Sequence, residues 1–481
     1  MSYISSESCV SRLQFSEYVK VCSLYGVGFY YIPGTDICMK LGGYVRFQQN
    51  FGATDITGGP FAGVGGLNTR VSSEDQSYRV RWLLQHDTRQ QTAYGTLRTY
   101  MILGFSQDSG TDTDITPAVR GAGVNRIYAT RAFIQLAGFT FGKATSYFDF
   151  VSSAAVAYNA GLTSSPDTGD AGHVVAAYTA QLGNGLSGTI SFEQERTRGI
   201  LYLGSPVFGG AGAVAAADLA GSNRLQDIVG NLRVDQAWGA AQVAIAAHNN
   251  SGSYYGVGPG GSLTEWNGHP EGKWGGAVTF GLRLNFPMIG PGDYFQGQVV
   301  YAQGASQYAS NTPGAFLAKQ GDTFAINVVN DGGFTGTAAA PGLYELTTAW
   351  SVFASYEHFW TPSLRTSLYG SYVDYSRPDG LNNALCASGL QAGGSSALGR
   401  AGGCDLNSQY WVVGSRSQWN ITKDLYMGFD VLYSKLNGAT LNNAGTYSAA
   451  AGNGVAPGNF YKTGSLDAVS AAWRIHRDIV P

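Results

Sequence analysis

The sequence predicts an all-β fold, a transmembrane antiparallel β-barrel of sixteen strands, and three observations lead to this prediction. Sixteen segments alternate apolar and polar side chains with a period of two, which is typical of strands whose two faces meet different surroundings. Long and short connections follow one another without exception. The composition is rich in glycine, with 68 residues, and poor in charge, at 13%, as a barrel with lipid-facing strands requires.

The connection lengths are the most informative of the three. Eight long connections alternate with seven short ones, and a glycine-rich secreted solenoid or sandwich, the alternative that composition leaves open, has no reason to alternate them. Outer-membrane barrels have an even strand number, short periplasmic turns and long extracellular loops. The predicted strands are 40–51, 78–87, 92–105, the first part of 125–150, 139–143, 174–182, 186–195, 225–235, 240–247, 274–286, 294–306, 348–359, 364–375, 410–419, 425–436 and 466–477.

Two short connections and one long one carry further information. Asn184-Gly185 is the strongest hairpin signal in the chain, and a very short connection is expected at Arg89-Gln90. In the stretch 125–150 a strand with Arg131 on one face and Tyr128 on the other is followed by a tight reversal at Gly138. After the returning strand the alternation stops. We expect this third long loop, about 144–171, to fold into the barrel lumen.

Bulk properties exclude several classes of protein and divide the chain. The formal net charge of −3 gives no basis for binding nucleic acid. No apolar run reaches the roughly 18 residues of a membrane helix. The first residues lack the charged and apolar regions of a signal peptide. We therefore expect an atypical N-terminus over 1–16, a periplasmic segment over 17–37 and the barrel over 38–478.

Four of the five cysteines form two local pairs. Cys22 and Cys38 are 16 residues apart, and Cys386 and Cys404 are 18 apart. In an oxidising compartment each pair would close a short loop, worth roughly 3 kcal/mol in the chain-entropy model. Five free thiols in a reducing compartment are the alternative.

Arginines share the predicted lumen-facing side of four consecutive strands. On the lipid face each would cost a few kcal/mol, so they are placed inward. Neighbouring strands lie about 4.8 Å apart, so the guanidinium groups would form a contiguous positive wall. These arginines are Arg46, Arg79, Arg81, Arg98 and Arg131.

The third long loop supplies acids that we expect to face this wall, namely Asp149, Asp167 and Asp170. A positive wall opposite an acidic loop would set a transverse field across a constriction and favour small polar solutes. The alternative is that the arginines stiffen the barrel through ion pairs with Glu193, Glu195, Asp227 and Asp235.

Nothing in the sequence indicates an enzyme, a cofactor or a metal. The pattern Gly256-x-Gly258-x-x-Gly261 lies in a long loop, contains Pro259 and precedes no helix, so it does not predict a dinucleotide site. No G-x-S-x-G elbow is present. The histidines have no metal-ligand spacing; they are His86, His173, His248, His269, His358 and His476.

The segment 17–43, EYVKVCSLYGVGFYYIPGTDICMKLGG, resembles the start of the mature alphaproteobacterial porins, the outer-membrane porins of rhizobia and brucellae. The matching elements are the EYVKVC box, the YIPGT turn, Cys38 and the GGYVR that opens the first strand. RAFIQLAGFTFGKATSYFDF resembles the fourth strand and the entry of the constriction loop in the same family. Both ends depart from the family, which begins with a cleaved signal peptide and ends on an aromatic residue.

The resemblance implies a trimeric general porin of the bacterial outer membrane. The expected function is passive diffusion of small hydrophilic solutes and ions, and the expected partners are outer-membrane lipid, lipopolysaccharide and two further copies of the chain. Two alternatives stay open. One is a channel specific for sugars or other small solutes, and the other is a non-conducting structural or adhesion barrel whose lumen is filled by the long loop 304–346.

Overall fold

A computed structural model gives the fold of this chain. It describes residues 20–52, 76–108, 124–160, 163, 167–169, 172–203, 225–255, 265–310, 316–320, 323–388, 403–440, 446–448 and 460–479.

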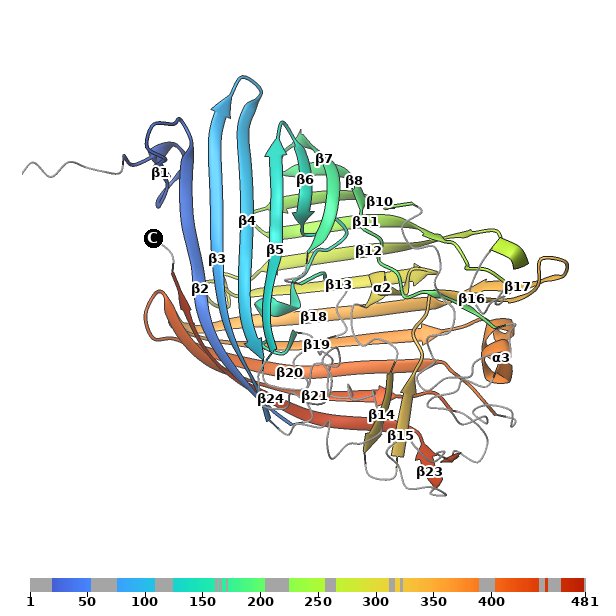
Figure 1. Cartoon of the computed structure of the whole chain (residues 1–481). Helices are drawn as coiled ribbons and strands as arrows, with labels where there is room; N and C mark the ends of the chain where they lie inside the picture. Colours follow the sequence, from blue (N-terminus) through green and yellow to red (C-terminus); the bar gives the residue numbers. More distant parts are fainter. Residues whose placement is uncertain are drawn as a thin grey trace, which may run out of the picture.

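Sixteen strands of the described chain close into one antiparallel barrel, as the alternation predicts (Figure 1). The barrel closes where β24 (Ser465–Asp478) pairs with β2 (Cys38–Phe51). Closure matters because lipid offers no hydrogen bonds to an unpaired sheet edge. The other barrel strands are β3 (Gln76–Thr92), β4 (Gly95–Asp108), β5 (Val124–Leu136), β6 (Phe139–Ala144), β7 (His173–Gly183), β8 (Leu186–Glu193), β10 (Asp227–Gln236), β11 (Gly239–Asn250), β12 (Lys273–Asn285), β13 (Tyr294–Gln303), β18 (Thr348–Thr361), β19 (Leu364–Ser376), β20 (Ser408–Asn420) and β21 (Leu425–Asn437).

The sequence misplaced one turn. β3 does not end before Arg89-Gln90 but continues to Thr92, and the reversal lies at Ala93 and Tyr94. The reason is local, since Gly95 adopts a φ of 106° that the turn requires and no glycine lies near position 89. The predicted turn therefore lies four residues before the observed one, while the order and pairing of the two strands are as expected.

The sequence also missed an irregularity in β5. Ile102 of β4 pairs with Arg131, but the next residue, Leu103, pairs with Ala129, so Thr130 is extra. An extra residue of this kind reverses the alternation beyond it. Tyr128 consequently lies on the same face as Arg131 and not on the opposite one. Its ring covers Gly104, where an added Cβ would come within 2.4 Å of it.

The two faces of the barrel differ in the manner expected of strands between lipid and water. Outward positions carry large apolar side chains that are about half exposed, such as Val45, Trp82 and Phe280. Inward positions carry buried polar side chains, such as Gln48 and Ser351. In the described part of the chain no helix is long and apolar enough to cross a membrane.

Both predicted disulfides are present. Cys22–Cys38 links the segment before the barrel to the first residue of β2, where Phe29, Tyr25 and Tyr31 pack around it. Cys386–Cys404 lies in the connection between β19 and β20. Cys9 lies outside the described residues.

The long connections gather at one end of the barrel and carry additional structure there (Figure 1). Two small sheets combine segments from different connections: β9–β16–β17 and β14–β15–β23–β22. These elements, with the remaining short ones, are β1 (Tyr30–Tyr31), β9 (Ile200–Tyr202), α2 (Ser306–Ala309), β14 (Phe316–Gln320), β15 (Thr323–Asn327), β16 (Gly332–Gly336), β17 (Pro341–Leu346), α3 (Asp379–Ser388), β22 (Thr446–Ser448) and β23 (Phe460–Thr463).

The N-terminal disulfide gives a first testable prediction. Replacing Cys22 and Cys38 together by serine is expected to lower the free energy of unfolding by roughly 3 kcal/mol, because the unfolded chain regains the freedom of the closed loop. Urea unfolding of the refolded barrel in detergent measures this. Cys9→Ser is the control for loss of a cysteine, because Cys9 belongs to neither of the two disulfides. An unchanged unfolding midpoint in the Cys22/Cys38 variant would contradict the prediction.

Candidate functional site: the loop inside the barrel and the arginine-bearing wall

The loop between β6 and β7 lies inside the barrel and follows its inner wall. Side chains from successive strands bind its backbone. Gln242 of β11 donates to the carbonyl of Tyr147 at 3.3 Å, and Gln298 of β13 accepts from the amide of Val151 at 3.2 Å. Farther along, Ser367 of β19 donates to the Val156 carbonyl at 2.6 Å. The prediction that this loop folds into the lumen is therefore confirmed for its described residues.

Wall carboxylates accept hydrogen bonds from the backbone of this loop. Asp430 of β21 accepts from the amides of Tyr158 and Asn159 at 2.6 and 3.3 Å. Glu193 of β8 accepts from the Tyr147 amide at 2.9 Å. Both carboxylates are fully buried. An irregular backbone that is taken out of bulk water needs such partners, because an unpaired buried amide is costly.

Arginines from the same wall balance these acids. Arg416 donates to the Ala155 carbonyl at 2.7 Å and also binds Glu357. Arg474 of β24 donates to the Tyr158 carbonyl at 3.1 Å, and its guanidinium lies 4.1 Å from the centre of the Tyr158 ring. Each buried charge thus has hydrogen-bonding partners, as burial demands.

Two strand glycines make room for the aromatic side chains of the loop. A Cβ added to Gly428 of β21 would come within 2.1 Å of the Tyr158 hydroxyl, and one added to Gly281 of β12 within 2.3 Å of the Phe150 ring. The loop therefore packs directly on strand backbone at these points. Glycine at inward strand positions is the sequence signal for such close approach.

The next part of the wall, on β2 and β3, carries three of the predicted arginines. Arg46 of β2 pairs in register with Arg81 of β3, and Gln48 pairs with Arg79. Directly opposed residues of an antiparallel pair lie on the same face. Gln48 reaches the loop at Asn159, at 3.3 Å, so this face is the inner one.

The five arginines do not form one continuous wall. Arg98 lies eight residues along β4 from Ser106, the partner of Arg81, which is about 26 Å at the rise of a strand. There it shares the Asp87 carboxylate with Arg89, at 2.9 and 3.0 Å. Position along the strand therefore separates Arg98 from Arg46, Arg79 and Arg81.

Arg131 holds the two ends of the loop together. It donates to the Thr145 hydroxyl at 3.0 Å, where the loop begins, and to the Gly169 carbonyl at 3.1 Å, near its end. A Cβ at Gly172 would come within 2.7 Å of this guanidinium. Arg131 is thus bound to the loop itself, whereas the sequence placed it opposite the loop.

The loop acids do not lie as the sequence suggested. Asp149 forms a buried ion pair with Arg196, at 2.6 Å, and also accepts from the amide of Thr168 at 2.8 Å. Asp167 accepts from both the amide and the hydroxyl of Ser153, each at 2.7 Å. These carboxylates are turned into the loop and its supporting wall, because the backbone needs acceptors there. Asp170 lies outside the described residues.

Arg196 is the residue whose role the sequence did not reveal. It follows β8, is almost completely buried, and lies over the Tyr308 ring at 4.6 Å. Burial by itself would lower the pKa of Arg196, but the Asp149 carboxylate more than compensates, so the pKa lies above its ordinary value. No motif marks this residue. Its position just past an inward-facing Glu193 was the available signal.

Two of the acids in the alternative interpretation bind residues other than the predicted wall arginines. Asp227 binds His248 and the Tyr308 hydroxyl, each at 2.7 Å. Asp235 pairs with Arg233 at 2.8 Å on the same strand. Among the predicted wall arginines, Arg98 forms an ion pair with Asp87, an acid that the sequence analysis did not name.

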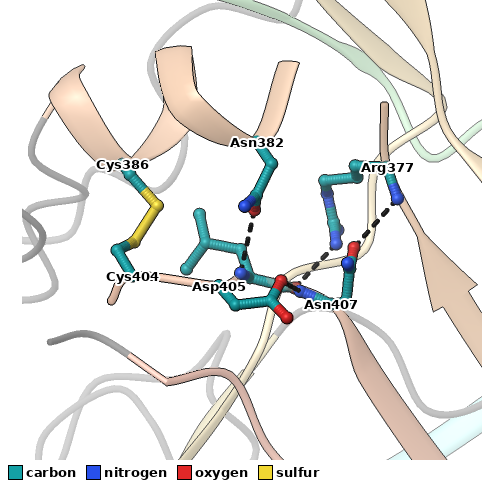
Figure 2. Close-up of a disulfide and its surroundings, with 7 residues drawn as sticks. Arg377, Asn382, Cys386, Cys404, Asp405 and Asn407 are labelled. Atoms are coloured by element: carbon teal, nitrogen blue, oxygen red, sulfur yellow. Dashed lines mark hydrogen bonds between the residues drawn. A yellow bond between two sulfur atoms is a disulfide. The ribbon is translucent and has the colours of Figure 1, made fainter. Parts of the chain in front are cut away.

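Beyond the loop, buried polar groups connect the long connections. Arg377 donates to the carbonyl of Leu406 at 2.7 Å and to the side chain of Asn330 at 3.1 Å. Burial lowers the pKa of Arg377 to about 10, which leaves it charged at neutral pH. Figure 2 shows this group beside the Cys386–Cys404 disulfide, which holds the end of α3 to the same segment.

Comparison with known proteins identifies the family. A family model described as the porin subfamily matches residues 13–459. The chain belongs to this porin subfamily. Porin Omp2b of Brucella suis is 30% identical over 233 residues, which are 48% of this chain and 57% of that protein. Omp2b of Brucella melitensis biotype 1 is 30% identical over 236 residues, 48% of this chain and 56% of that protein.

The chain therefore spans little more than half the length of these curated relatives. Among solved structures, the outer membrane channel DcaP of Acinetobacter baumannii has the same fold, with a TM-score of 0.52 at 14% identity. The match covers 92% of this porin-family chain and 99% of that chain. The chain is an outer-membrane β-barrel of the porin type, as the resemblance of its N-terminal segment implied.

The anchoring of the loop gives a second prediction. Replacing Asp430 by alanine removes the acceptor of two loop amides and leaves them buried without a partner. We expect a loss of roughly 3 kcal/mol in stability and faster hydrogen exchange over 154–160. Asp235→Ala is the control, because that carboxylate is exposed in a surface pair worth less than about 1 kcal/mol. Unchanged exchange in the Asp430 variant would show that the loop is held elsewhere.

Proposed function

We propose that this chain forms a passive, water-filled channel for small hydrophilic solutes and ions across the outer membrane. The observation that carries the proposal is the arrangement of the inner loop, which is hydrogen-bonded to inward side chains from β8 round to β24 and, at Gln48, to β2. The proposed constriction lies between this loop and the wall carrying Arg46, Arg79 and Arg81. Family membership and the sixteen-stranded barrel support it, because barrels of this size enclose an aqueous lumen.

The assembly and the surroundings are part of the same proposal. The resemblance to the alphaproteobacterial porins supports a homotrimer, with outer-membrane lipid and lipopolysaccharide around it. Diffusion through such a channel needs neither a cofactor nor a catalytic residue.

A second candidate, a non-conducting structural barrel, is favoured by one observation. Part of the connection between β13 and β18 packs inside the barrel. Ser351, which faces inward from β18, donates to the Ala309 carbonyl of α2. The ring of Tyr308 in α2 packs against the Phe148 ring of the inner loop, with 4.7 Å between the two ring centres. A lumen closed by this connection would explain the same contacts.

Single-channel recording separates the two candidates. The refolded chain is expected to produce stepwise conductance in a planar bilayer, in groups of three steps for a trimer. A folded, heat-modifiable barrel without steps would overturn the channel proposal. Replacing 306–327, which includes α2, by a short glycine-serine linker is the matched variant, and conductance that appears only after this replacement would establish the non-conducting barrel. Heat-denatured protein controls for membrane leak.

A further inference from the structure

A histidine and two methionines lie together on β2, β3 and β4, three neighbouring strands of the barrel (Figure 1). Nε2 of His86 in β3 lies 2.9 Å from Sδ of Met39 in β2. Met101 of β4 is the direct partner of His86 in register. Two of the five methionines of the chain thus adjoin a single histidine.

Register places all three side chains on the outer face of the barrel. Trp82 points outward and lies four residues before His86 on β3, so the two share a face. Directly opposed residues also share a face, which puts Met101 beside His86 with about 5 Å between their Cβ atoms. Met39 is diagonal to His86, because the direct partner of His86 on β2 is Leu41. Diagonal neighbours of this kind are within reach of long side chains.

These side chains lie where the outer face changes from apolar to polar. Away from the short turn between β3 and β4, Trp82 stacks on Phe105. Toward the turn, the next pair is Thr88 and Thr99, whose hydroxyl groups contact each other. Met101 is 39% exposed, and the other two side chains are partly exposed. An ion from the aqueous side of the short turns can therefore reach this point without crossing the apolar belt.

The chemistry of these side chains favours a soft metal ion. Thioether sulfur selects Cu(I), whereas Mg²⁺ and Ca²⁺ take oxygen ligands and Zn²⁺ takes thiolate, imidazole or carboxylate. A neutral ligand set leaves the charge of the ion uncompensated, so a monovalent ion costs less than a divalent one beside an apolar belt. In the described part of the chain no group of three histidine, cysteine, aspartate or glutamate residues could hold a metal ion, so this site depends on methionine.

We infer that Met39, His86 and Met101 form a binding site for a soft monovalent metal ion, Cu(I) or its analogue Ag(I). The ligands are Nε2 of His86 and the two sulfur atoms. Across a metal at ordinary bond lengths such atoms lie about 3.5 Å apart, so the sulfur of Met39 must move by roughly 0.6 Å. The three rotatable bonds of methionine permit this shift. Because the ligands come from three strands, no spacing within one segment of the sequence reveals them.

Methionine methyl NMR of the refolded barrel tests the site. Protein with isotope-labelled methionine methyl groups is titrated with silver nitrate in chloride-free buffer. A Cys9→Ser background is used, because the other four cysteines form disulfides and a free thiol would itself bind silver. We expect the signals of Met39 and Met101 to shift together and to saturate at one silver ion per chain.

Single substitutions assign the ligands. His86→Gln removes the imidazole, and Met101→Leu removes a thioether at nearly unchanged volume. Each is expected to weaken silver binding at least about tenfold, because loss of even an outer partner of a metal ligand typically costs that much. Met288→Leu is the matched control and should leave the affinity unchanged, since that side chain is 79% exposed on the turn between β12 and β13. Heat-modifiability on gels verifies that each variant folds.

The outcomes test separate parts of the inference. No saturable shift of the Met39 and Met101 signals would overturn the site. Shifts that persist with the same affinity in His86→Gln or Met101→Leu would overturn the three-ligand arrangement. Equal shifts with zinc nitrate at the same concentration would overturn the selectivity for soft ions. None of these results bears on passage through the lumen, which single-channel recording tests.

Discussion

An irregular loop inside a barrel must find hydrogen-bond partners for its own backbone, and much of the interior depends on this requirement. The loop between β6 and β7 has no sheet to pair with, so side chains of the wall take the place of a neighbouring strand. Asp430, Glu193 and Gln298 accept from its amides, and Ser367, Gln242 and Arg416 donate to its carbonyls. Leaving a buried amide or carbonyl without a partner would destabilise the fold more than burying these polar side chains does.

The same requirement determines which charged side chains of the interior are buried and which stay accessible to water. Acids that accept from buried amides lose their exposure to water, and arginines of the same wall are needed beside them. On β2 the loop binds Gln48, and Arg46 on the same strand stays partly accessible. Which of these charges are buried is thus a consequence of how the loop is held. Total composition, with 29 basic and 32 acidic residues, gives no hint of it.

Buried charges also hold together the long connections that gather at one end of the barrel. Asp331 is fully buried and accepts from the amide and hydroxyl of Ser306 at 2.7 Å, while its own amide binds the carbonyl of Gly199. Arg377 links the same connection, between β13 and β18, to the one between β19 and β20. Segments far apart in sequence are therefore held together by single buried charges, with Phe334, Tyr202 and Tyr255 packed as a small apolar core between them.

The sequence by itself determined the strands, because period-two alternation and loop length are local properties that a membrane barrel enforces along its whole length. The same alternation placed Arg46 and Arg81 on the inward side, and the short spacing of the cysteines predicted both disulfide pairs, which are present. It could not determine the bulge at Thr130, the ion pair of Asp149 with Arg196, or the separation of Arg98 from the other arginines. These depend on register and on contacts between residues far apart in the chain, such as Tyr158 with Asp430, which only the closed barrel brings together.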